Sequence, residues 1–235
     1  MPTSYDEGSR ISVSVIVPVR NEAAIIADFL RHLRSRIGDA ELLVVDGGSS
    51  DGTTELAARQ ATVLSAAPGR ARQMNAGARS TAGDALWFVH ADAWVPENPV
   101  AVIRAALADP RVAGGCFRLE IPHPAWVYRL NDRLGNLGVD VCRIACGDHG
   151  LFVRRAVFER VGGYPDVPIL EDVELYRRAG RLGRMRQLRP AIRTSPRRWE
   201  ENGPWRTTAI YAVILALYTL GVPIERLHRL HRRLR

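Results

Sequence analysis

The stretch SVSVIVPVRNE, residues 12–22, decides the fold class of this chain. Its apolar and β-branched start predicts a buried strand over 12–18. Because proline has no N–H, we expect the strand to stop pairing at Pro18 and to continue as a loop at the edge of the sheet. That loop can offer Arg20 and Glu22 to a ligand. An ordinary strand exit that leads into a capped helix explains the same residues equally well.

Outward from this stretch, apolar runs alternate with amphipathic stretches, which is typical of βαβ units around a mainly parallel sheet. We expect strands over 12–18, 41–46, 62–65, 85–90, 112–119 and 150–154, and helices over 21–36, from about 51, and over 70–80, 126–137 and 171–180. No linker separates the two halves. The sequence therefore predicts one α/β, Rossmann-like domain with a mixed, mainly parallel sheet flanked by helices.

Composition limits the classes of function. A chain of 235 residues with 46% apolar content can bury one good core. All 33 basic residues are Arg, which excludes a Walker-type phosphate lysine and a Schiff-base lysine. The net charge of +8 favours anionic partners such as a sugar nucleotide or an acidic membrane surface. Nucleic acid is not expected as a partner. Net charge is the only feature that would support it, and the sequence shows no recognised nucleic-acid-binding module.

Cysteine use and the N-terminus indicate a cytoplasmic protein. Cys116, Cys142 and Cys146 form neither a disulfide framework nor a CxxC pair, which fits a reducing compartment. Cys142, Cys146 and His149 could line one helical face as metal ligands, but buried small apolar residues are the favoured interpretation. Residues 1–11 are polar, lack the features of a signal peptide and are interpreted as a flexible arm.

Two aspartates follow expected strands at the edge where open α/β sheets place their ligands. Asp46 opens the turn DGGSSDGT, in which glycines let the backbone approach a ring or ribose while the carboxylate accepts its donors. A glycine-rich turn that only joins strand to helix is the alternative. Asp92 ends the segment HAD, residues 90–92, and could bind a divalent metal that bridges two phosphates of a nucleoside diphosphate.

Two further pairs of charged residues stand at expected helix starts. Arg70 and Arg72 lie where N–H groups, the helix dipole and guanidinium groups all favour anions, although solvated surface arginine is the simpler interpretation of each. Glu171 and Asp172 open a helix and could be an ordinary charged first turn. Alternatively, one of the two points into a cleft and accepts a proton from an acceptor hydroxyl.

Seven segments in a fixed order resemble family-2 glycosyltransferases with a GT-A fold, over roughly residues 12–200. They are VPVRNE, DGGSSDGT, GRARQMNAG, HAD, GDHGLFVRR, VGGYP and EDVEL. The short length and the wording RQMNAG and GDHGLF are similar to a compact bacterial subgroup labelled arsenosugar-biosynthesis-type glycosyltransferases.

The resemblance implies an inverting hexosyltransferase that moves a sugar from a nucleoside-diphosphate sugar to a hydroxyl acceptor. It implies Mg²⁺ or Mn²⁺ held by the diphosphate and by Asp92, and Asp172 as the catalytic base beside Glu171. It also places four residues near the nucleoside, namely Pro18, Arg20, Glu22 and Asp46. A catalytically silent nucleotide-sugar or membrane-surface binding protein is the alternative from another class.

Two segments depart from the family pattern. The Asp-x-Asp metal motif appears here as His90-Ala91-Asp92, so only its last carboxylate carries over. SPRRW, residues 195–199, keeps only the end of a motif found in processive synthases, and processive polymerisation is not expected. Arg198 is expected to contact the diphosphate. Trp199 either stacks on an acceptor sugar or anchors the C-terminal segment.

The C-terminal segment, residues 201–235, is expected to be helical. Its apolar run 209–222 has 14 residues, too few to span a bilayer, and a basic stretch follows. A helix docked on the core or forming a homodimer is one interpretation. The other is an interfacial helix that brings 205–235 to the inner face of the membrane, where the acceptor would be lipid-linked.

Overall fold

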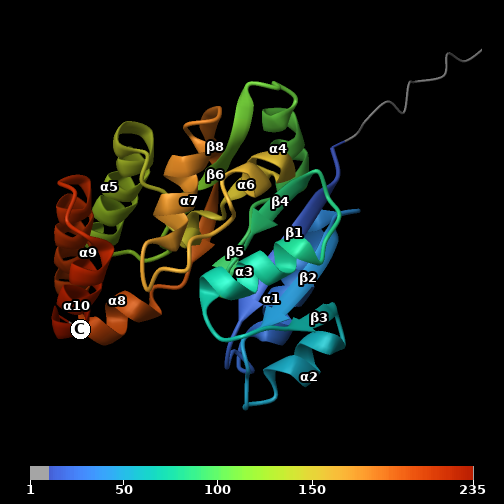
Figure 1. Cartoon of the computed structure of the whole chain (residues 1–235). Coiled ribbons are helices and arrows are strands. Elements are labelled where there is room, and N and C mark those ends of the chain that lie inside the picture. Colours follow the sequence, from blue (N-terminus) through green and yellow to red (C-terminus); the bar gives the residue numbers. More distant parts are fainter. Residues whose placement is uncertain (1–10, 235) are drawn as a thin grey trace, which may run out of the picture.

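A single eight-stranded sheet organises the computed structural model, which describes residues 11–234 except the side chain of Arg198. The strand order is β3-β2-β1-β4-β7-β6-β8-β5 (Figure 1). The strands are β1 (Val13–Val19), β2 (Glu41–Asp46), β3 (Thr62–Ser65), β4 (Ala85–Phe88), β5 (Ala93–Trp94), β6 (Val112–Glu120), β7 (Phe152–Arg154) and β8 (Arg184–Thr194). All pairings among β3, β2, β1 and β4 are parallel, as is β6 with β8, whereas β7 and β5 run antiparallel to their neighbours.

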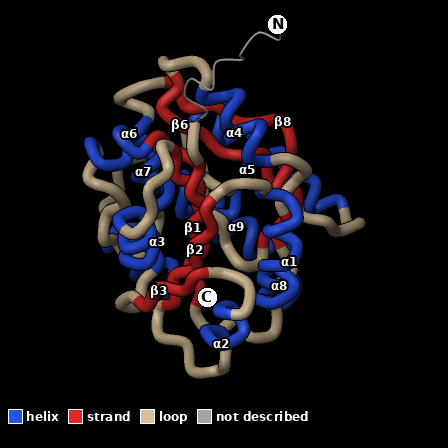
Figure 2. Tube along the Cα trace, turned by 90° about the vertical axis from the view of Figure 1, so that its right-hand side faces the viewer, coloured by secondary structure: helices blue, strands red, loops and turns tan. Residues whose placement is uncertain are grey.

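Helices cover both faces of this sheet. They are α1 (Ile26–Ile37), α2 (Thr53–Ala58), α3 (Arg70–Arg79), α4 (Pro99–Leu107), α5 (Trp126–Cys142), α6 (Arg155–Arg160), α7 (Glu171–Ala179), α8 (Arg197–Asn202), α9 (Pro204–Thr219) and α10 (Ile224–Leu234), with one 3₁₀ turn, η1 (Gly147–His149). Figure 2 shows α3, α6 and α7 on one side of the strands and α1 and α4 on the other. The expected α/β class is therefore confirmed.

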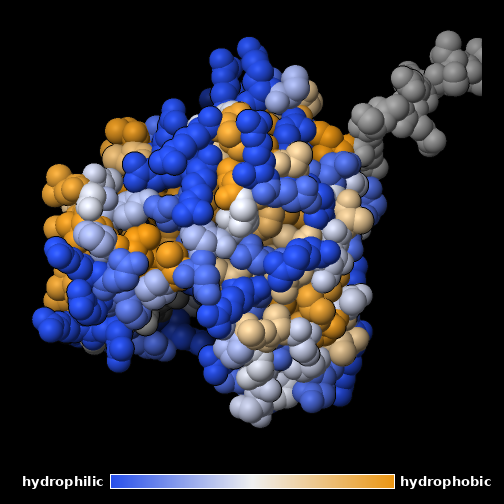
Figure 3. All heavy atoms as spheres, viewed as in Figure 1, coloured by the Kyte–Doolittle hydropathy of each residue, from blue (hydrophilic) through white to orange (hydrophobic). Residues whose placement is uncertain are grey.

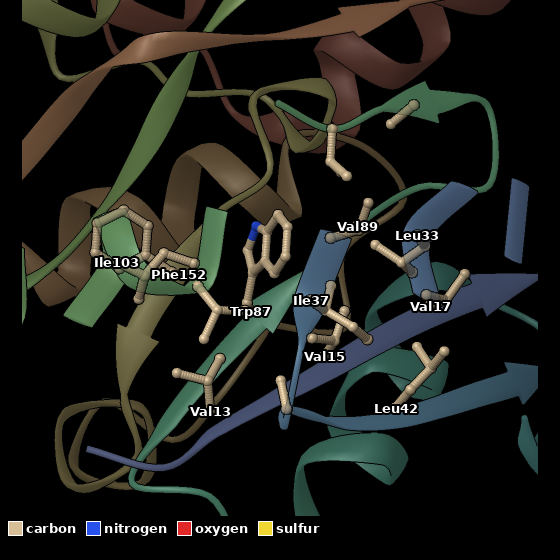
Figure 4. Close-up of a cluster of buried hydrophobic side chains, with 14 of the residues drawn as sticks. Val13, Val15, Val17, Leu33, Ile37, Leu42, Trp87, Val89, Ile103 and Phe152 are labelled. Atoms are coloured by element: carbon tan, nitrogen blue, oxygen red, sulfur yellow. The ribbon is translucent and has the colours of Figure 1, made fainter. Parts of the chain in front are cut away.

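Alternation along β1 explains the two layers of core. Val15 and Val17 point to the α1/α4 side, where Trp87 and Phe152 are also buried (Figure 4). Ile16 points to the other face and packs with residues of α3, α6 and α7. Every residue of β1 is buried, as expected for a central parallel strand with both faces covered.

The expectation that pairing stops at Pro18 is wrong. β1 runs on to Val19, and its register with β2 includes Pro18 opposite Val45. The ladder from β1 to β4 has already ended at Ile16 and Phe88. Successive residues of a parallel strand bond to opposite neighbours, so the backbone nitrogen of Pro18 faces the side of β4. β4 no longer pairs with β1 at this position, and the missing N–H therefore costs no hydrogen bond of the ladder.

Several elements were not expected from the sequence, the longest being α4 and β8, and one expected helix begins late. α4 buries apolar residues at helical spacing, and β8 is an 11-residue strand that pairs with both β6 and β5. The helix expected over 21–36 begins only at Ile26, because Asn21 is in a left-handed conformation with φ of 56° and a turn follows it.

The C-terminal segment is helical, as expected, and α9 and α10 form a hairpin. Ile214 and Tyr218 of α9 and Leu227 of α10 are buried together with Val173 of α7. The Tyr218 hydroxyl also donates a hydrogen bond to Glu174. Among the described residues, no helix combines the length and apolar character that crossing a bilayer requires. The expected arm over 1–11 lies, apart from its last residue, outside the described part of the chain.

Candidate functional site

Two loops join side by side at the carboxyl ends of β1 and β2. The backbone N–H groups of Glu22 and Ala23 donate to the side chains of Thr53 and Asp51, at 2.8 Å and 3.0 Å. Asn21 accepts the N–H of Ser50 through its side-chain oxygen. These bonds fix the loop that follows β1, so Arg20 and Glu22 leave the sheet in a defined direction. Arg20 is exposed, and its contact with a nucleoside remains a prediction.

Asp46 is buried, and the turn that it opens occupies its carboxylate. The N–H groups of Gly48 and Ser49 donate to it at 3.0–3.2 Å, and the Ser49 hydroxyl donates as well. Burial alone would raise the pKa of Asp46, but the hydrogen bonds from Ser49 and Gly48 outweigh burial and hold the pKa below its usual value. This geometry supports the structural interpretation of the turn, and nucleoside binding by Asp46 stays a prediction.

The motif RARQMNAG builds the wall beside this turn. Gln73 is buried and donates to the carbonyl oxygens of Val19 and Val45, both at 2.8 Å, which ties α3 to the ends of β1 and β2. Asn75 exchanges two hydrogen bonds with the backbone of Tyr164. A Cβ at Gly77 would lie 3.0 Å from Val45, so glycine permits the close packing of helix on strand.

The two arginines of this motif have different partners. The Arg70 guanidinium forms an ion pair with Glu171 at 2.8 Å. Burial alone would lower the pKa of Arg70, but the charges of Glu171, Asp172 and nearby acids raise it overall. Arg72 instead forms a two-bond contact with the exposed Asp166, at 2.9 Å and 3.1 Å. The structure thus brings Arg70 to the carboxylate pair and directs Arg72 to the surface.

A pocket of about 390 Å³ opens beside the ends of these strands. Glu22 comes to it from the loop after β1, Asp92 from the segment after β4, and Asp148 from η1. Arg197 and Trp199 of α8 also line the pocket. The pocket therefore gathers three carboxylates, one guanidinium and one indole from four separate parts of the sequence, as expected at the carboxyl edge of an α/β sheet.

The acidic wall of this pocket suits a hard divalent cation. Burial and the charge of Asp92 raise the pKa of Glu22, whereas Arg197 opposes the rise. Oxygen ligands of this kind are those that Mg²⁺ and Mn²⁺ prefer. Residues 11–234 contain no preformed cluster of three acidic, His or Cys ligands. The residues fit a cation whose coordination is completed by a phosphorylated ligand, and the role of Asp92 as its protein ligand stays a prediction.

Asp172 is a buried carboxylate beside the pocket, not part of its lining. One of its oxygens, Oδ1, is buried without a hydrogen bond of ordinary geometry among the described residues, and the buried Tyr164, whose pKa is raised by burial and by the charge of Asp172, is a neighbour. Burial and the charge of Glu171 raise the pKa of Asp172 to about 6, with Arg70 and His90 opposing. Leu170, immediately before the pair, has a φ of 63°, a strained conformation of the kind that accumulates at functional sites.

His90 links the pocket to Asp172. Its Nδ1 lies 3.1 Å from the carboxylate of Asp148, and its Nε2 is buried with no hydrogen-bond partner among the described residues. Burial would lower the pKa of His90, but the hydrogen bond and charge of Asp148 raise it overall. Gly147 separates the ring from Asp172, since a Cβ there would lie 2.6 Å from Nε2 of His90 and 2.7 Å from Oδ2 of Asp172.

We expect Gly147→Ala to destabilise the protein by about 1–3 kcal/mol, because the added methyl must displace His90, Asp172 or both. Urea unfolding monitored by circular dichroism measures this change. Gly138→Ala is the matched control, because that glycine lies within α5 and a Cβ there meets nothing within 4 Å. The control should be neutral or slightly stabilising. Equal stability of the two variants would contradict the packing described for Gly147.

Part of the segment SPRRW lies at the pocket. Trp199 is buried against Tyr128 of α5 and Tyr211 of α9, which supports its role as an anchor, and its edge also lines the pocket. The side chain of Arg198 lies outside the described residues, so its contact with a diphosphate stays a prediction. Arg197 was missed, although its position beside the expected arginine was a usable signal.

Other expected site residues are placed as follows. His149 is buried, and its Nδ1 lies 3.2 Å from the carbonyl oxygen of Cys146. Burial lowers its pKa, which makes it a neutral core residue. Burial also raises the pKa of the Cys146 thiol to about 12, whereas Cys142 is exposed. The interpretation that these residues bind a metal therefore finds no support among the described residues.

Comparison with known sequences finds matches that each cover more than half of this chain. The sequence model of Glycosyl transferase family 2 matches residues 14–161. Succinoglycan biosynthesis protein ExoA of Rhizobium meliloti (strain 1021) is 30% identical over 207 residues, which cover 77% of this chain and 61% of the relative. The undecaprenyl-phosphate 4-deoxy-4-formamido-L-arabinose transferase of Pseudomonas aeruginosa (strain LESB58) is 34% identical over 158 residues, which cover 60% of this chain and 46% of the relative. The chain thus spans less than two thirds of either relative.

Solved structures share the fold. Mannosyltransferase PcManGT from Pyrobaculum calidifontis, in complex with GDP-Man and Mn²⁺, superposes with a TM-score of 0.66 at 23% identity, covering 88% of this chain and 63% of that one. Glucosyl-3-phosphoglycerate synthase from Mycobacterium tuberculosis, in complex with Mn²⁺, UDP and its product, gives a TM-score of 0.65 at 20% identity, covering 91% and 81%. At such identities the likeness confirms the expected fold.

Proposed function

The chain belongs to glycosyl transferase family 2, and on this premise we propose that it is an inverting GT-A glycosyltransferase. It transfers a sugar from a nucleoside-diphosphate sugar to a hydroxyl acceptor in a single displacement. The observation that carries the proposal is the buried carboxylate of Asp172, one oxygen of which lacks an ordinary hydrogen bond within the described part of the chain, beside a pocket of acidic and basic groups. Membership of the arsenosugar-type subgroup remains part of the proposal.

The environment of Asp172 suits a general base. A single displacement needs one group that accepts the proton of the attacking hydroxyl, on the side opposite the leaving group. With a pKa of about 6, Asp172 is ionised at neutral pH and yet basic enough to take a proton. Glu171 is held by Arg70, so its role in this proposal is to position that arginine and to raise the pKa of Asp172.

Asp92 and the basic residues of the pocket suit the leaving group. A bound Mg²⁺ or Mn²⁺ would neutralise the negative charge that develops on the departing diphosphate. Asp92 would hold this ion, and Arg197 lines the same pocket as a second positive charge. Two solved structures of the same fold were determined with Mn²⁺ and a nucleotide or sugar nucleotide, which supports the proposal for this chain.

The acceptor is proposed to be a lipid-linked hydroxyl compound at the inner face of the cytoplasmic membrane. The name of one relative, the undecaprenyl-phosphate transferase, states a lipid-linked substrate for that protein. Another relative is named beta-monoglucosyldiacylglycerol synthase, from Trichormus variabilis, and is 24% identical over 192 residues. The names of these two relatives support a lipid-linked acceptor independently of the geometry of this pocket.

Calorimetric titration of the purified chain with UDP, GDP and dTDP, and with their common sugar conjugates, tests the proposal. We expect one nucleotide to bind, and to bind more tightly with Mn²⁺ present, because the cation joins Asp92 to the diphosphate. Slow release of nucleoside diphosphate from the matching sugar conjugate should accompany binding. Failure of every nucleotide to bind would overturn the proposal. Binding without any turnover across hydroxyl acceptors would favour a catalytically silent binding protein.

A further inference from the structure

An apolar surface lies on the outside of α5 and α9, the two helices that pack against Trp199 of the pocket. On α5, Trp126 is 60% exposed, Leu137 55% and Val141 70%, at spacings that place them on one helical face. On α9, Trp205 is 53% exposed and Val213 45%, and Leu220, directly after the end of α9, is 80% exposed. Six large apolar side chains on and directly beside two adjacent helices exceed what scattered surface exposure explains. We call this surface the α5/α9 face.

The α5/α9 face is continuous where its two helices begin. The rings of Trp126 and Trp205 meet edge to face, with centroids 4.8 Å apart. Asn131 of α5 donates a hydrogen bond to Thr208 of α9 at 2.8 Å, so the helices are in direct contact along this side. In Figure 3, orange spheres gather at the left edge, where Figure 1 places α5 and α9.

α9 is apolar on both sides, and only one side is packed. Its inner residues Thr207, Ile214 and Tyr218 are buried, whereas Ala209, Ala212 and Ala216 are exposed between its exposed large side chains. The exposed apolar residues recur at intervals of three and four along the whole helix. A helix that is apolar all round is normally covered on every side or lies in lipid. Nothing in the described chain covers the outer side of α9.

Positive charge flanks the apolar surface. Six arginines are exposed on α5 and α10, four on α10 and two on α5, namely Arg129, Arg133, Arg226, Arg229, Arg232 and Arg233. The exposed acidic residues of these two helices are Asp140 and Glu225. Two tryptophans, an apolar face and an excess of arginine form the pattern by which amphipathic helices bind anionic lipid.

We propose that the α5/α9 face, with the arginines of α10, docks the protein on a membrane surface rich in anionic lipid. A second copy of the chain is disfavoured as the occupant, because a two-fold contact would set the arginine-rich margin against itself. The same helices support the pocket, since Tyr128 of α5 and Tyr211 of α9 pack on Trp199. Docking therefore deepens the proposed function, because it holds the pocket near a lipid-linked acceptor, but lipid binding itself needs no donor, metal or turnover.

Vesicle flotation of the full chain tests the proposal, with vesicles of phosphatidylcholine alone and of phosphatidylcholine with phosphatidylglycerol. We expect binding to the anionic vesicles that weakens as salt rises from about 0.1 M to about 1 M. Val213→Glu should lower vesicle binding at least about tenfold, because it sets a charge into the apolar contact. Leu182→Glu is its matched control, since Leu182 is 39% exposed in the turn after α7 and should leave binding unchanged.

A second pair of variants separates charge from apolar contact. Arg229→Glu with Arg232→Glu should lower binding at least about tenfold, and Arg79→Glu with Arg160→Glu, exposed on α3 and α6, should not. Light scattering of each variant reports the oligomeric state. A dimer that Val213→Glu converts to a monomer, with no vesicle binding by the unaltered chain, would overturn the proposal in favour of self-association. Vesicle binding that Val213→Glu and the α10 pair both leave unchanged would also overturn it.

The outcome is independent of the proposed enzyme activity. If the protein binds anionic vesicles but no nucleotide, the docking proposal stands and the proposed function fails. If it binds nucleotide with Mn²⁺ but no vesicle, the proposed function stands and the docking proposal fails. Asp172→Asn should float as the unaltered chain does, because Asp172 is buried beside the pocket and away from this surface.

Discussion

Asp172→Asn is expected to lower turnover by two to four orders of magnitude while donor binding stays near normal, the range for loss of a general base. Asparagine keeps the shape of the side chain and removes its ability to accept a proton. In the unaltered chain, turnover should rise with pH up to about 6, where Asp172 becomes ionised, and then level off. Steady-state assays across this range, with donor affinity measured by calorimetry, check both parts.

Stability supplies the control for this variant. The pKa of Asp172 is raised from 3.8 to about 6 in the folded protein, so ionisation there opposes folding. Its favourable contribution is complete below pH 3.8 and is lost as pH rises through about 6. At about pH 8, Asp172→Asn should therefore be more stable than the unaltered chain, by up to about 3 kcal/mol. The difference should shrink toward about pH 4. A variant that is both less active and unfolded would leave the base assignment without support, and full turnover would contradict it.

The central strands and the carboxylate pair could be predicted because their signals are local. β2 and β3 have the bounds expected from their apolar runs, and α7 begins at Glu171 as expected. β8 was not expected, and it contains Pro190, a residue that ordinarily argues against a strand. The structure accommodates this proline at a shift in register, where Leu188 pairs with Phe117 and Ala191 already pairs with Arg118.

The site could be predicted only where a single residue type, such as a carboxylate at the end of a strand, indicates a chemical role by itself. Asp92 and Glu22 were expected and do share a pocket. The contact of His90 with Asp148 joins residues 58 positions apart, and no local pattern encodes such a pairing. Asp46 was expected to face a ligand, but in the structure its carboxylate accepts hydrogen bonds from its own turn. A carboxylate that binds a ligand and one that stabilises a turn give the same sequence pattern.

The α5/α9 face shows a second limit of sequence patterns. The apolar run of α9 predicts burial, and its inner side is indeed buried with Leu227 and Val173. The outer side could not be assigned, because periodicity reports that a helix is apolar all round and not which neighbour covers each side. Trp126 and Trp205 lie far apart in the chain, so their contact became visible only in the fold.

Asp92→Ala is expected to abolish the gain in nucleotide affinity that Mn²⁺ provides and to lower turnover by at least about 100-fold. The reason is that the cation stabilises the departing diphosphate by several kcal/mol, and each 1.4 kcal/mol is a factor of ten in rate. Calorimetry with and without Mn²⁺ measures the first effect, and release of nucleoside diphosphate measures the second. Affinity measured without metal should change little, because in this proposal the nucleoside itself is held by other residues.

Asp28→Ala is the matched control for this loss. Asp28 lines the same pocket, but its carboxylate is 73% exposed and forms a 2.7 Å ion pair with Arg31 on α1. Removing it subtracts the same charge from the pocket without removing the proposed metal ligand. Mn²⁺ should therefore still tighten nucleotide binding in Asp28→Ala. Equal losses in the two variants would mean that the pocket attracts the cation through its overall negative charge, and Asp92 would lose its assignment as the metal ligand.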